Sequence, residues 1–141
     1  MASGVKGSRK GYGAPCAECG DVLSVENAYA RKDLPGALLS YCKVCIGKRN
    51  TAYRYRVRAE MIAAYGGRCV CCGETEPKFL AIDHINNNGA EDRRNLGILG
   101  GHQMVAHLKK LGYPKDEYQL LCHNCNCAKG WYGACPHTEE R

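Results

Sequence analysis

Large aromatic side chains and long apolar runs are scarce in this sequence. Its 141 residues include one Phe and one Trp, although nine Tyr are present. No run approaches the roughly eighteen apolar residues of a membrane-spanning helix, so we expect no membrane partner. The start of the chain, residues 1–6, also lacks the apolar segment of a secretory signal. We therefore expect the chain to act in a reducing compartment, the cytoplasm.

Cysteine, by contrast, is abundant. A chain of this length with so few large apolar side chains builds a small core, and such cores need disulfides or metal ions to stabilise them. Eleven Cys are present, and their odd number argues against a closed set of disulfides. In a reducing compartment, clustered cysteines are typically metal ligands. We therefore expect structural zinc.

The excess of positive charge lies in the first half of the chain. Residues 1–66 hold eleven Lys and Arg against five Asp and Glu, whereas residues 67–141 hold nine of each kind, which accounts for the net charge of +6. A one-sided basic field favours a polyanionic partner, and double-stranded DNA is the partner we expect. Ordinary solubility charge is the alternative, because small soluble domains often carry a net charge of this size.

The N-terminal part divides into a tail and a zinc-binding unit. Residues 1–13 are rich in Gly, Ser and Lys, which is typical of a flexible basic tail. Residues 14–47 contain two CxxC pairs, formed by Cys16, Cys19, Cys42 and Cys45. Each pair places two thiolates on one side of a tight turn, and two such turns complete a tetrahedron around Zn²⁺. Gly20 suits the positive φ that such a turn needs.

A basic helix is expected next, over residues 48–66. Apolar side chains recur on one stripe of the pattern, at Tyr53, Val57, Met61 and Ala64, and Gly66 ends it. Five cations lie off this stripe, namely Lys48, Arg49, Arg54, Arg56 and Arg58. Because no acid compensates them and two tyrosines are interleaved with them, we predict contacts with DNA phosphates. A solvated face of a linker helix is the alternative.

Residues 67–131 contain a second set of cysteines around a long insertion. The set comprises Cys69, Cys72, Cys122 and Cys125, and 49 residues separate its two CxxC pairs. So long a spacer must hold a folded subdomain, with the zinc at its base. The patterns predict a strand over residues 78–85, an exposed loop over 90–100, a helix over 102–111, a strand over 118–121 and a short helix beginning at residue 126. Residues 132–141 are expected to be a loose tail, and the fold class is α+β.

The first predicted strand of this segment leads to the adjacent pair Asp83 and His84. A carboxylate is a hard oxygen ligand that suits Mg²⁺ or Mn²⁺. An imidazole can take a proton from water near neutral pH. Because the strand opens into the Asn-rich turn 86–89, we expect both side chains to reach one cleft. A water molecule activated there beside a metal-bound phosphate would hydrolyse a phosphodiester.

Three motifs, in this order, resemble the HNH nucleases, the ββα-metal or His-Me finger family, in the form common in bacteriophage. They are Cys69-x-x-Cys72-Gly73, then Ile82-Asp83-His84-Ile85-Asn86, then Leu121-Cys122-x-x-Cys125-Asn126-x-x-Lys129-Gly130, within residues 68–130. The resemblance implies a small zinc-stapled ββα-metal (HNH) nuclease domain, preceded here by an N-terminal four-cysteine zinc-knuckle unit and a basic linker helix. It also implies a phage-infected bacterial cell as the place of action.

The resemblance implies a role for each matching residue. His84 would be the general base, Asp83 and Asn126 would hold a catalytic Mg²⁺ or Mn²⁺, and the second set of cysteines would hold a structural Zn²⁺. The product would carry a 5′-phosphate. The family's middle residue, usually Asn, would fall near residues 116–118, where no Asn is present. Its role of orienting the base would pass to a backbone carbonyl or to one of Asn86, Asn87 and Asn88.

Several Cys and His residues remain outside these assignments. Cys71 and Cys127 could each replace a neighbouring ligand, and Cys135 with His137 is a third metal hypothesis that lacks two ligands. Of the remaining histidines, His107 is expected to be structural and His123 exposed. His102 is expected at a helix start or on the surface, and a position near the metal is the alternative. About two zinc ions per chain are predicted from the two sets of four cysteines.

The sequence thus predicts a metal-dependent DNA endonuclease that hydrolyses phosphodiester bonds. A non-catalytic, zinc-dependent DNA-binding protein on the same scaffold is the alternative, and a metal-regulated protein-interaction module is a third possibility. Asp83, His84 and Asn126 favour the enzyme, because a scaffold alone needs none of them.

Overall fold

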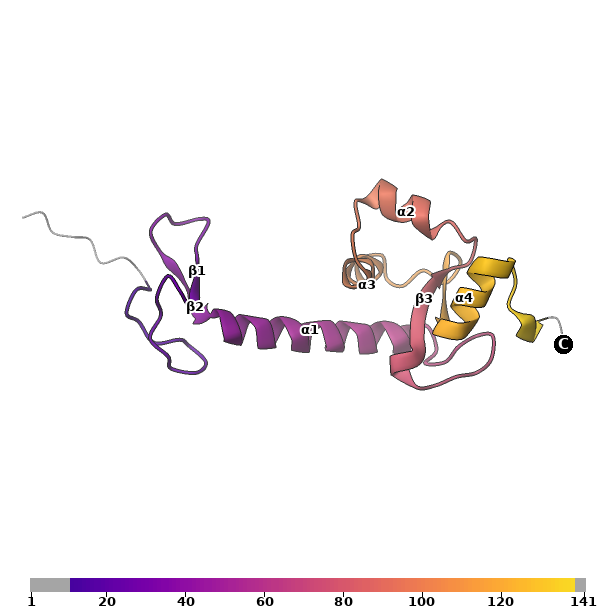
Figure 1. The fold of residues 1–141 in the computed structure, drawn as a ribbon, viewed down its shortest axis with the longest axis horizontal. Helices are drawn as coiled ribbons and strands as arrows, with labels where there is room; N and C mark the ends of the chain where they lie inside the picture. Colours follow the sequence, from indigo (N-terminus) through magenta and orange to yellow (C-terminus); the bar gives the residue numbers. More distant parts are fainter. Residues whose placement is uncertain (1–10, 139–141) are drawn as a thin grey trace, which may run out of the picture. The chain divides into compact units, whose positions relative to one another are not determined.

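The computed structural model describes residues 11–138. The chain divides into two compact units, Met1–Tyr53 and Arg54–Arg141, and helix α1 (Lys43–Ala64) contributes residues to both (Figure 1). The predicted basic helix is therefore not a segment separate from the two units. It also begins earlier than expected, directly after the last residue of the strand that precedes it.

The first unit is a small two-stranded sheet packed around cysteines. Strands β1 (Ala28–Ala30) and β2 (Leu38–Cys42) pair antiparallel. Six buried residues of this unit form one cluster, composed of Cys16, Leu23, Ala28, Leu38, Cys42 and Cys45. Three of the six are thiols, so the apolar core of the unit is small, as the composition predicted.

Three residues of the predicted basic tail belong to the folded first unit. Residues 1–10 lie outside the described part of the chain, but residues 11–13 belong to the first unit. Tyr12 packs against the buried cluster, and the Gly13 N–H donates to the Leu23 carbonyl at 3.0 Å. The assignment of residues 11–13 to a flexible tail was therefore wrong, because the aromatic ring of Tyr12 adds apolar contact to a unit that has little of it.

The apolar stripe of α1 is partly as predicted. Val57 and Met61 are buried in the core of the second unit, together with Ile62 and the following Tyr65. Tyr53 is 47% exposed, so the stripe does not extend to it. The helix ends at two glycines of positive φ, and the Gly67 N–H returns to the Ile62 carbonyl at 2.8 Å, which satisfies a carbonyl at the helix end.

The second unit is built on two antiparallel strands followed by a helix. Strands β3 (Leu80–His84) and β4 (Tyr118–Cys122) pair antiparallel over their full length, with Asp83 opposite Gln119 and His84 opposite Tyr118. A 3-10 turn, η1 (Pro77–Phe79), precedes β3. Helix α4 (His123–Tyr132) follows β4 and packs against both strands. The predicted α+β class is therefore confirmed.

The connection between β3 and β4 carries two helices. Helix α3 (Gly101–Lys110) was predicted with an apolar stripe of Met104, Val105, Leu108 and Leu111; the first three are buried, whereas Leu111 follows the helix and is exposed. Helix α2 (Gly89–Leu96) was not: residues 90–100 were expected to be an exposed loop. The signals for α2 were present, because acids occupy its first turn, Arg93 and Arg94 its last, and Gly97 ends it with a left-handed φ of 64°.

The C-terminal segment is more ordered than predicted. Helix α4 begins at His123 rather than at residue 126, and a 3-10 turn, η2 (Pro136–Thr138), follows it. Cys135 is buried in the core of the second unit, so the assignment of a loose tail was wrong through residue 138. Residues 139–141 lie outside the described part. Within residues 11–138, no helix has the length and apolar character needed to cross a membrane.

Candidate metal and catalytic centre

The first cysteine set (Cys16, Cys19, Cys42 and Cys45) is assembled from two similar turns. Its four sulfur atoms lie within 4.8 Å of one another. The Cys42 N–H donates to the Cys16 sulfur at 3.3 Å, and the Cys45 N–H donates to the Cys42 sulfur at 3.5 Å. Gly20 has a φ of 80° and its N–H returns to the Cys16 carbonyl, so the predicted positive φ is confirmed.

The second cysteine set (Cys69, Cys72, Cys122 and Cys125) repeats this geometry. Its sulfur atoms also lie within 4.8 Å of one another. The Cys72 and Cys125 N–H groups donate to the sulfurs of Cys69 and Cys122 at 3.5 and 3.4 Å. Because Cys122 ends β4 and Cys125 lies in the first turn of α4, the set joins the strand pair to the helix.

Both sets have the dimensions of a zinc site. The sulfurs of Cys19 and Cys42, and those of Cys72 and Cys122, are each 3.7 Å apart. A disulfide would need about 2.05 Å. A tetrahedron with Zn–S bonds of about 2.3 Å has S···S edges of about 3.8 Å. Two cysteine groups that can hold zinc are therefore present, as the spacing predicted.

The thiols within each set differ in their pKa. Backbone N–H groups of Cys19 and Cys42 lower the pKa of Cys16 to about 6. Burial raises the pKa of Cys69, but the N–H bonds to its sulfur outweigh that and bring it to about 7. Burial raises the pKa of Cys45 and of Cys125. Zinc binding must therefore displace protons from the buried thiols, which makes metal affinity fall with falling pH.

His84, the predicted base, forms a pair with a residue that the sequence did not single out. Its Nε2 atom lies 2.9 Å from Oδ2 of Asp92 in α2, and the Tyr118 hydroxyl donates to the same oxygen at 2.8 Å. The hydrogen bond from His84 lowers the pKa of Asp92, so this carboxyl is ionised and only accepts. Nε2 of His84 must therefore carry the hydrogen, so in the neutral form of the imidazole the lone pair is on Nδ1.

The other face of the imidazole is bounded by a glycine. A Cβ atom on Gly89 would lie 2.7 Å from Nδ1 of His84. Only glycine fits this close to the ring without a clash, and the tilted Tyr118 ring, 4.7 Å from the imidazole centroid, holds the ring from the β4 side. The imidazole is thus oriented by Asp92 and Tyr118, and Gly89 packs against its Nδ1 edge.

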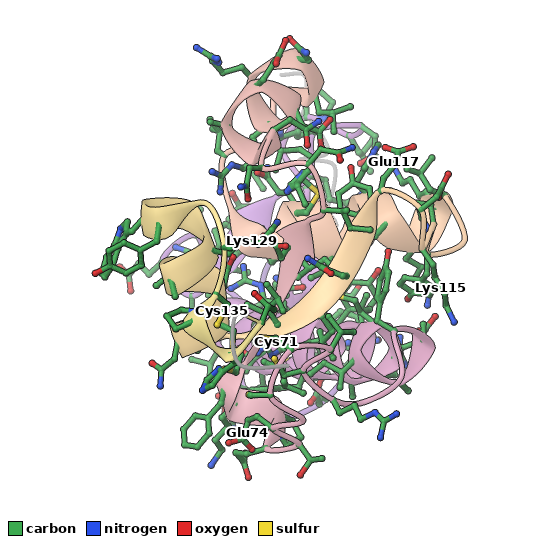
Figure 2. All side chains as sticks on the ribbon, turned by 90° about the vertical axis from the view of Figure 1, so that its right-hand side faces the viewer. Cys71, Glu74, Lys115, Glu117, Lys129 and Cys135 are labelled. Atoms are coloured by element: carbon green, nitrogen blue, oxygen red, sulfur yellow. The ribbon has the colours of Figure 1, made fainter. Side chains whose placement is uncertain are left out.

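Asp83 is a buried carboxylate with a cationic partner. It is 8% exposed, and its Oδ2 accepts from Gln119 Nε2 and from Lys129 Nζ, both at 2.7 Å. Lys129 also donates to the His84 carbonyl at 2.6 Å. Figure 2 shows Lys129 reaching from α4 towards the two strands. Lys129 therefore ties α4 to the end of β3 at both residues of the predicted Asp-His pair.

Asp83 and His84 are adjacent in β3, but their side chains contact different partners. Asp83 contacts Gln119 and Lys129, whereas His84 contacts Asp92 and Tyr118. We expected both side chains to reach one cleft because the strand was thought to open at this point. Instead, His84 is still paired with Tyr118 in the ladder, and the contact that the two residues share is Lys129.

The chemistry of Asp83 and Asn126 fits a hard divalent ion that keeps most of its water. Asn126 is half-buried in the first turn of α4, three residues before Lys129 and hence on the same helix face. Among the described residues, the groups of three or more His, Cys, Asp or Glu side chains that could bind a metal all consist mainly of cysteines. Neither Asp83 nor His84 belongs to such a group. One carboxylate and one amide suit Mg²⁺, which takes its other ligands from water and phosphate.

The five cations predicted to bind DNA differ in their surroundings. Arg58 donates to the carbonyls of Pro77 and Leu80, at 3.0 and 2.6 Å, so it secures α1 to the start of β3. Arg49 lies 4.3 Å from the Tyr41 ring centroid and 3.9 Å from Glu18. Lys48, Arg54 and Arg56 are exposed. Arg58 therefore has a structural role in the fold.

A second group of cations lies beside the His84–Asp92 pair. Arg93 and Arg94 follow Asp92 directly in α2, and both are exposed. They line an open hollow together with Ala90, Gly97, Ile98 and Leu99. Because the segment was expected to be a loop, the sequence did not connect these arginines with the Asp-His pair.

Comparison of the chain with protein-family models, with curated proteins and with solved structures finds no match. Its function must therefore be argued from its own residues.

Proposed function

We propose that this protein is a metal-dependent DNA endonuclease of the HNH type, with His84 as the general base. The observation that carries the proposal is the 2.9 Å hydrogen bond between His84 Nε2 and the ionised Asp92. This bond leaves Nδ1 as the nitrogen that can accept a proton. Asp92 thus takes the orienting role for which the sequence offered a backbone carbonyl or an asparagine of the turn.

The residues around His84 supply orientation for proton transfer. A water molecule beside Nδ1 would lose its proton to His84 as its oxygen attacks the phosphorus. Asp92 would stabilise the imidazolium that forms, and Tyr118 would keep Asp92 in place by its 2.8 Å hydrogen bond. In-line attack that breaks the bond to the 3′ oxygen would produce a 5′-phosphate end.

Asp83 and Asn126 would hold Mg²⁺ or Mn²⁺, which would supply charge stabilisation to the phosphate when bound. The two donors to Asp83 both use Oδ2, so its Oδ1 is the oxygen that we assign to the metal. Lys129 would compensate the Asp83 charge in the metal-free protein, because a buried carboxylate needs a partner.

Exposed cations would bind the DNA backbone. Lys48, Arg54 and Arg56 on α1, and Arg93 and Arg94 beside Asp92, would contact phosphates. Arg58 is left out because it bonds two carbonyls of its own chain. Phosphate contacts give affinity without sequence preference. The nuclease we propose is therefore one whose binding weakens steeply as salt concentration rises.

The test is a nicking assay on supercoiled plasmid with Mg²⁺ or Mn²⁺. We expect His84→Ala to lower the cleavage rate on the order of a hundredfold to ten-thousandfold, the usual contribution of a general base. His102→Ala is the matched control, because His102 is an exposed histidine on α3 and should leave the rate unchanged. If the wild-type protein binds DNA but never nicks it, the non-catalytic DNA-binding alternative takes the place of this proposal.

A further inference from the structure

Three side chains without a role in the candidate nuclease site converge near the second cysteine set. Cys71 is half-buried, Cys135 is 6% exposed, and His137 lies in η2. With the fully buried Cys125, their ligand atoms lie within 4.8 Å of one another. Figure 2 shows Cys71 and Cys135 near each other at the base of the second unit. In the sequence, a metal site formed by Cys135 and His137 lacked two ligands. The fold brings Cys71 and Cys125 into the two missing positions.

The distances in this cluster fit a metal with mixed sulfur and nitrogen ligands. Nδ1 of His137 lies 3.4 Å from the sulfurs of both Cys125 and Cys135. A tetrahedral zinc with Zn–S bonds of about 2.3 Å and a Zn–N bond of about 2.0 Å has S···N edges of about 3.5 Å. The imidazole nitrogen therefore faces the thiols at the spacing that a shared ion would impose.

The local chain geometry prepares two of these ligands. Cys135 and His137 flank Pro136, and the Thr138 N–H and hydroxyl both bond the Cys135 carbonyl, at 2.9 and 2.6 Å. This turn holds the thiol and the imidazole on one side, as a CxxC turn does for two thiols. The turn thus accounts for a buried cysteine so close to the C-terminus.

We propose that Cys71, Cys125, Cys135 and His137 bind a zinc ion that shares the Cys125 thiolate with the zinc of the second cysteine set. Seven residues then fill the eight ligand positions of two tetrahedra, because Cys125 belongs to both groups. Two Zn²⁺ with six thiolates and a neutral imidazole carry a charge of −2. A single Zn²⁺ in the second set carries the same charge, so the added ion compensates the added thiolates.

This binuclear site would fasten the C-terminal segment to the base of α4. Cys135 and His137 would be held to Cys71 of the first knuckle turn and to Cys125 of the second. Because the core of the second unit is small, two metal ions joined by one thiolate would stabilise it more than one ion does. The site is independent of the nuclease proposal, since it involves neither Asp83 nor His84.

Metal content of variants tests the proposal. The full-length protein is prepared in zinc, and zinc per chain is measured by elemental mass spectrometry in the wild type, Cys71→Ser, Cys135→Ser and His137→Ala. We expect each variant to hold one zinc fewer than the wild type. Cys127→Ser is the matched control, because Cys127 is an exposed cysteine of α4 outside every metal group, and it should keep the full content. A Cys135→Ser protein with wild-type zinc content overturns the proposal.

A measurement on the wild-type protein covers the case in which a variant fails to fold. In the protein loaded with ¹¹³Cd, we expect two cadmium resonances to be split by coupling through the shared Cys125 sulfur. Cadmium spectra without such a coupled pair overturn the bridged site. A Cys71–Cys135 disulfide detected in the intact protein by mass spectrometry also overturns it, because the two thiols would then be unavailable to a metal.

Discussion

Gly89, the first residue of α2, lies directly against the imidazole of His84. A Cβ atom at this position would come within 2.7 Å of Nδ1 and 3.1 Å of Cε1. The close approach places α2 so that Asp92, one turn further on, reaches Nε2 of the same ring. The absence of a side chain at Gly89 thus allows α2 to pack this closely against His84.

Gly89→Ala should therefore impair catalysis more than folding. The added methyl group must displace the imidazole ring of His84. A misplacement of about 1 Å can lower the rate on the order of a hundredfold. We expect the nicking rate to fall about tenfold to a hundredfold. Gly101→Ala is the control, because a Cβ at the first residue of α3 meets nothing within 4 Å. Equal rates for the two variants would refute the role of Gly89.

Asp92→Asn should lower kcat with little change in KM. An amide in place of the carboxylate removes the charge that orients His84 and stabilises its protonated form, an effect that reaches several thousandfold in hydrolases with this pairing. We expect kcat to fall by about a hundredfold or more in steady-state cleavage. Glu91→Gln, which alters the neighbouring exposed acid of α2, should leave kcat unchanged. An Asp92→Asn enzyme with normal kcat would show that Asp92 has only a structural role.

Lys129→Met should destabilise the second unit. The substitution leaves Asp83, which is 8% exposed, without its cationic partner. Removing one partner of a buried ion pair lowers the free energy of unfolding by about 3 kcal/mol. Urea denaturation should show this loss, whereas Lys110→Met, at an exposed lysine of α3, should cost almost nothing. The double variant Asp83→Asn, Lys129→Met should recover part of the stability. Unchanged stability in Lys129→Met would mean that the pair does not support the fold.

The alkaline stability of the second unit should depend on Tyr65. Burial, with Asp116 and Glu117 nearby, raises the pKa of Tyr65 to about 12, above the ordinary value of 10.0. A raised pKa contributes stability that is fully present below about pH 10 and is lost as pH rises towards 12. Between these values, the wild type should lose more stability in urea than Tyr65→Phe does. Parallel losses in the two proteins would contradict the assigned pKa.

Local spacing in the sequence was enough for the two zinc groups. A CxxC turn followed by glycine brings two thiols together within a few residues, so Cys16 with Cys19 and Cys69 with Cys72 could be assigned without a fold. The strand that contains Asp83 and His84, and helix α3, also follow from short-range patterns of apolar residues. Helix α2 was missed because it buries no residue and so leaves no apolar stripe, although its charged ends and Gly97 indicated it.

The amino-acid sequence by itself determined the α+β class, the four CxxC pairs and the identity of the Asp-His pair, because each depends on residues close together in the chain. Only the tertiary structure decided which residues complete them. Asp92 meets His84, Lys129 meets Asp83, and Cys71 meets Cys135 and His137. These partners are 8, 46 and more than 60 residues apart, so they meet only when the strands and helices of the second unit pack together. The spacing of residues in the sequence determines the geometry within one turn, whereas tertiary packing determines which turns and side chains come together.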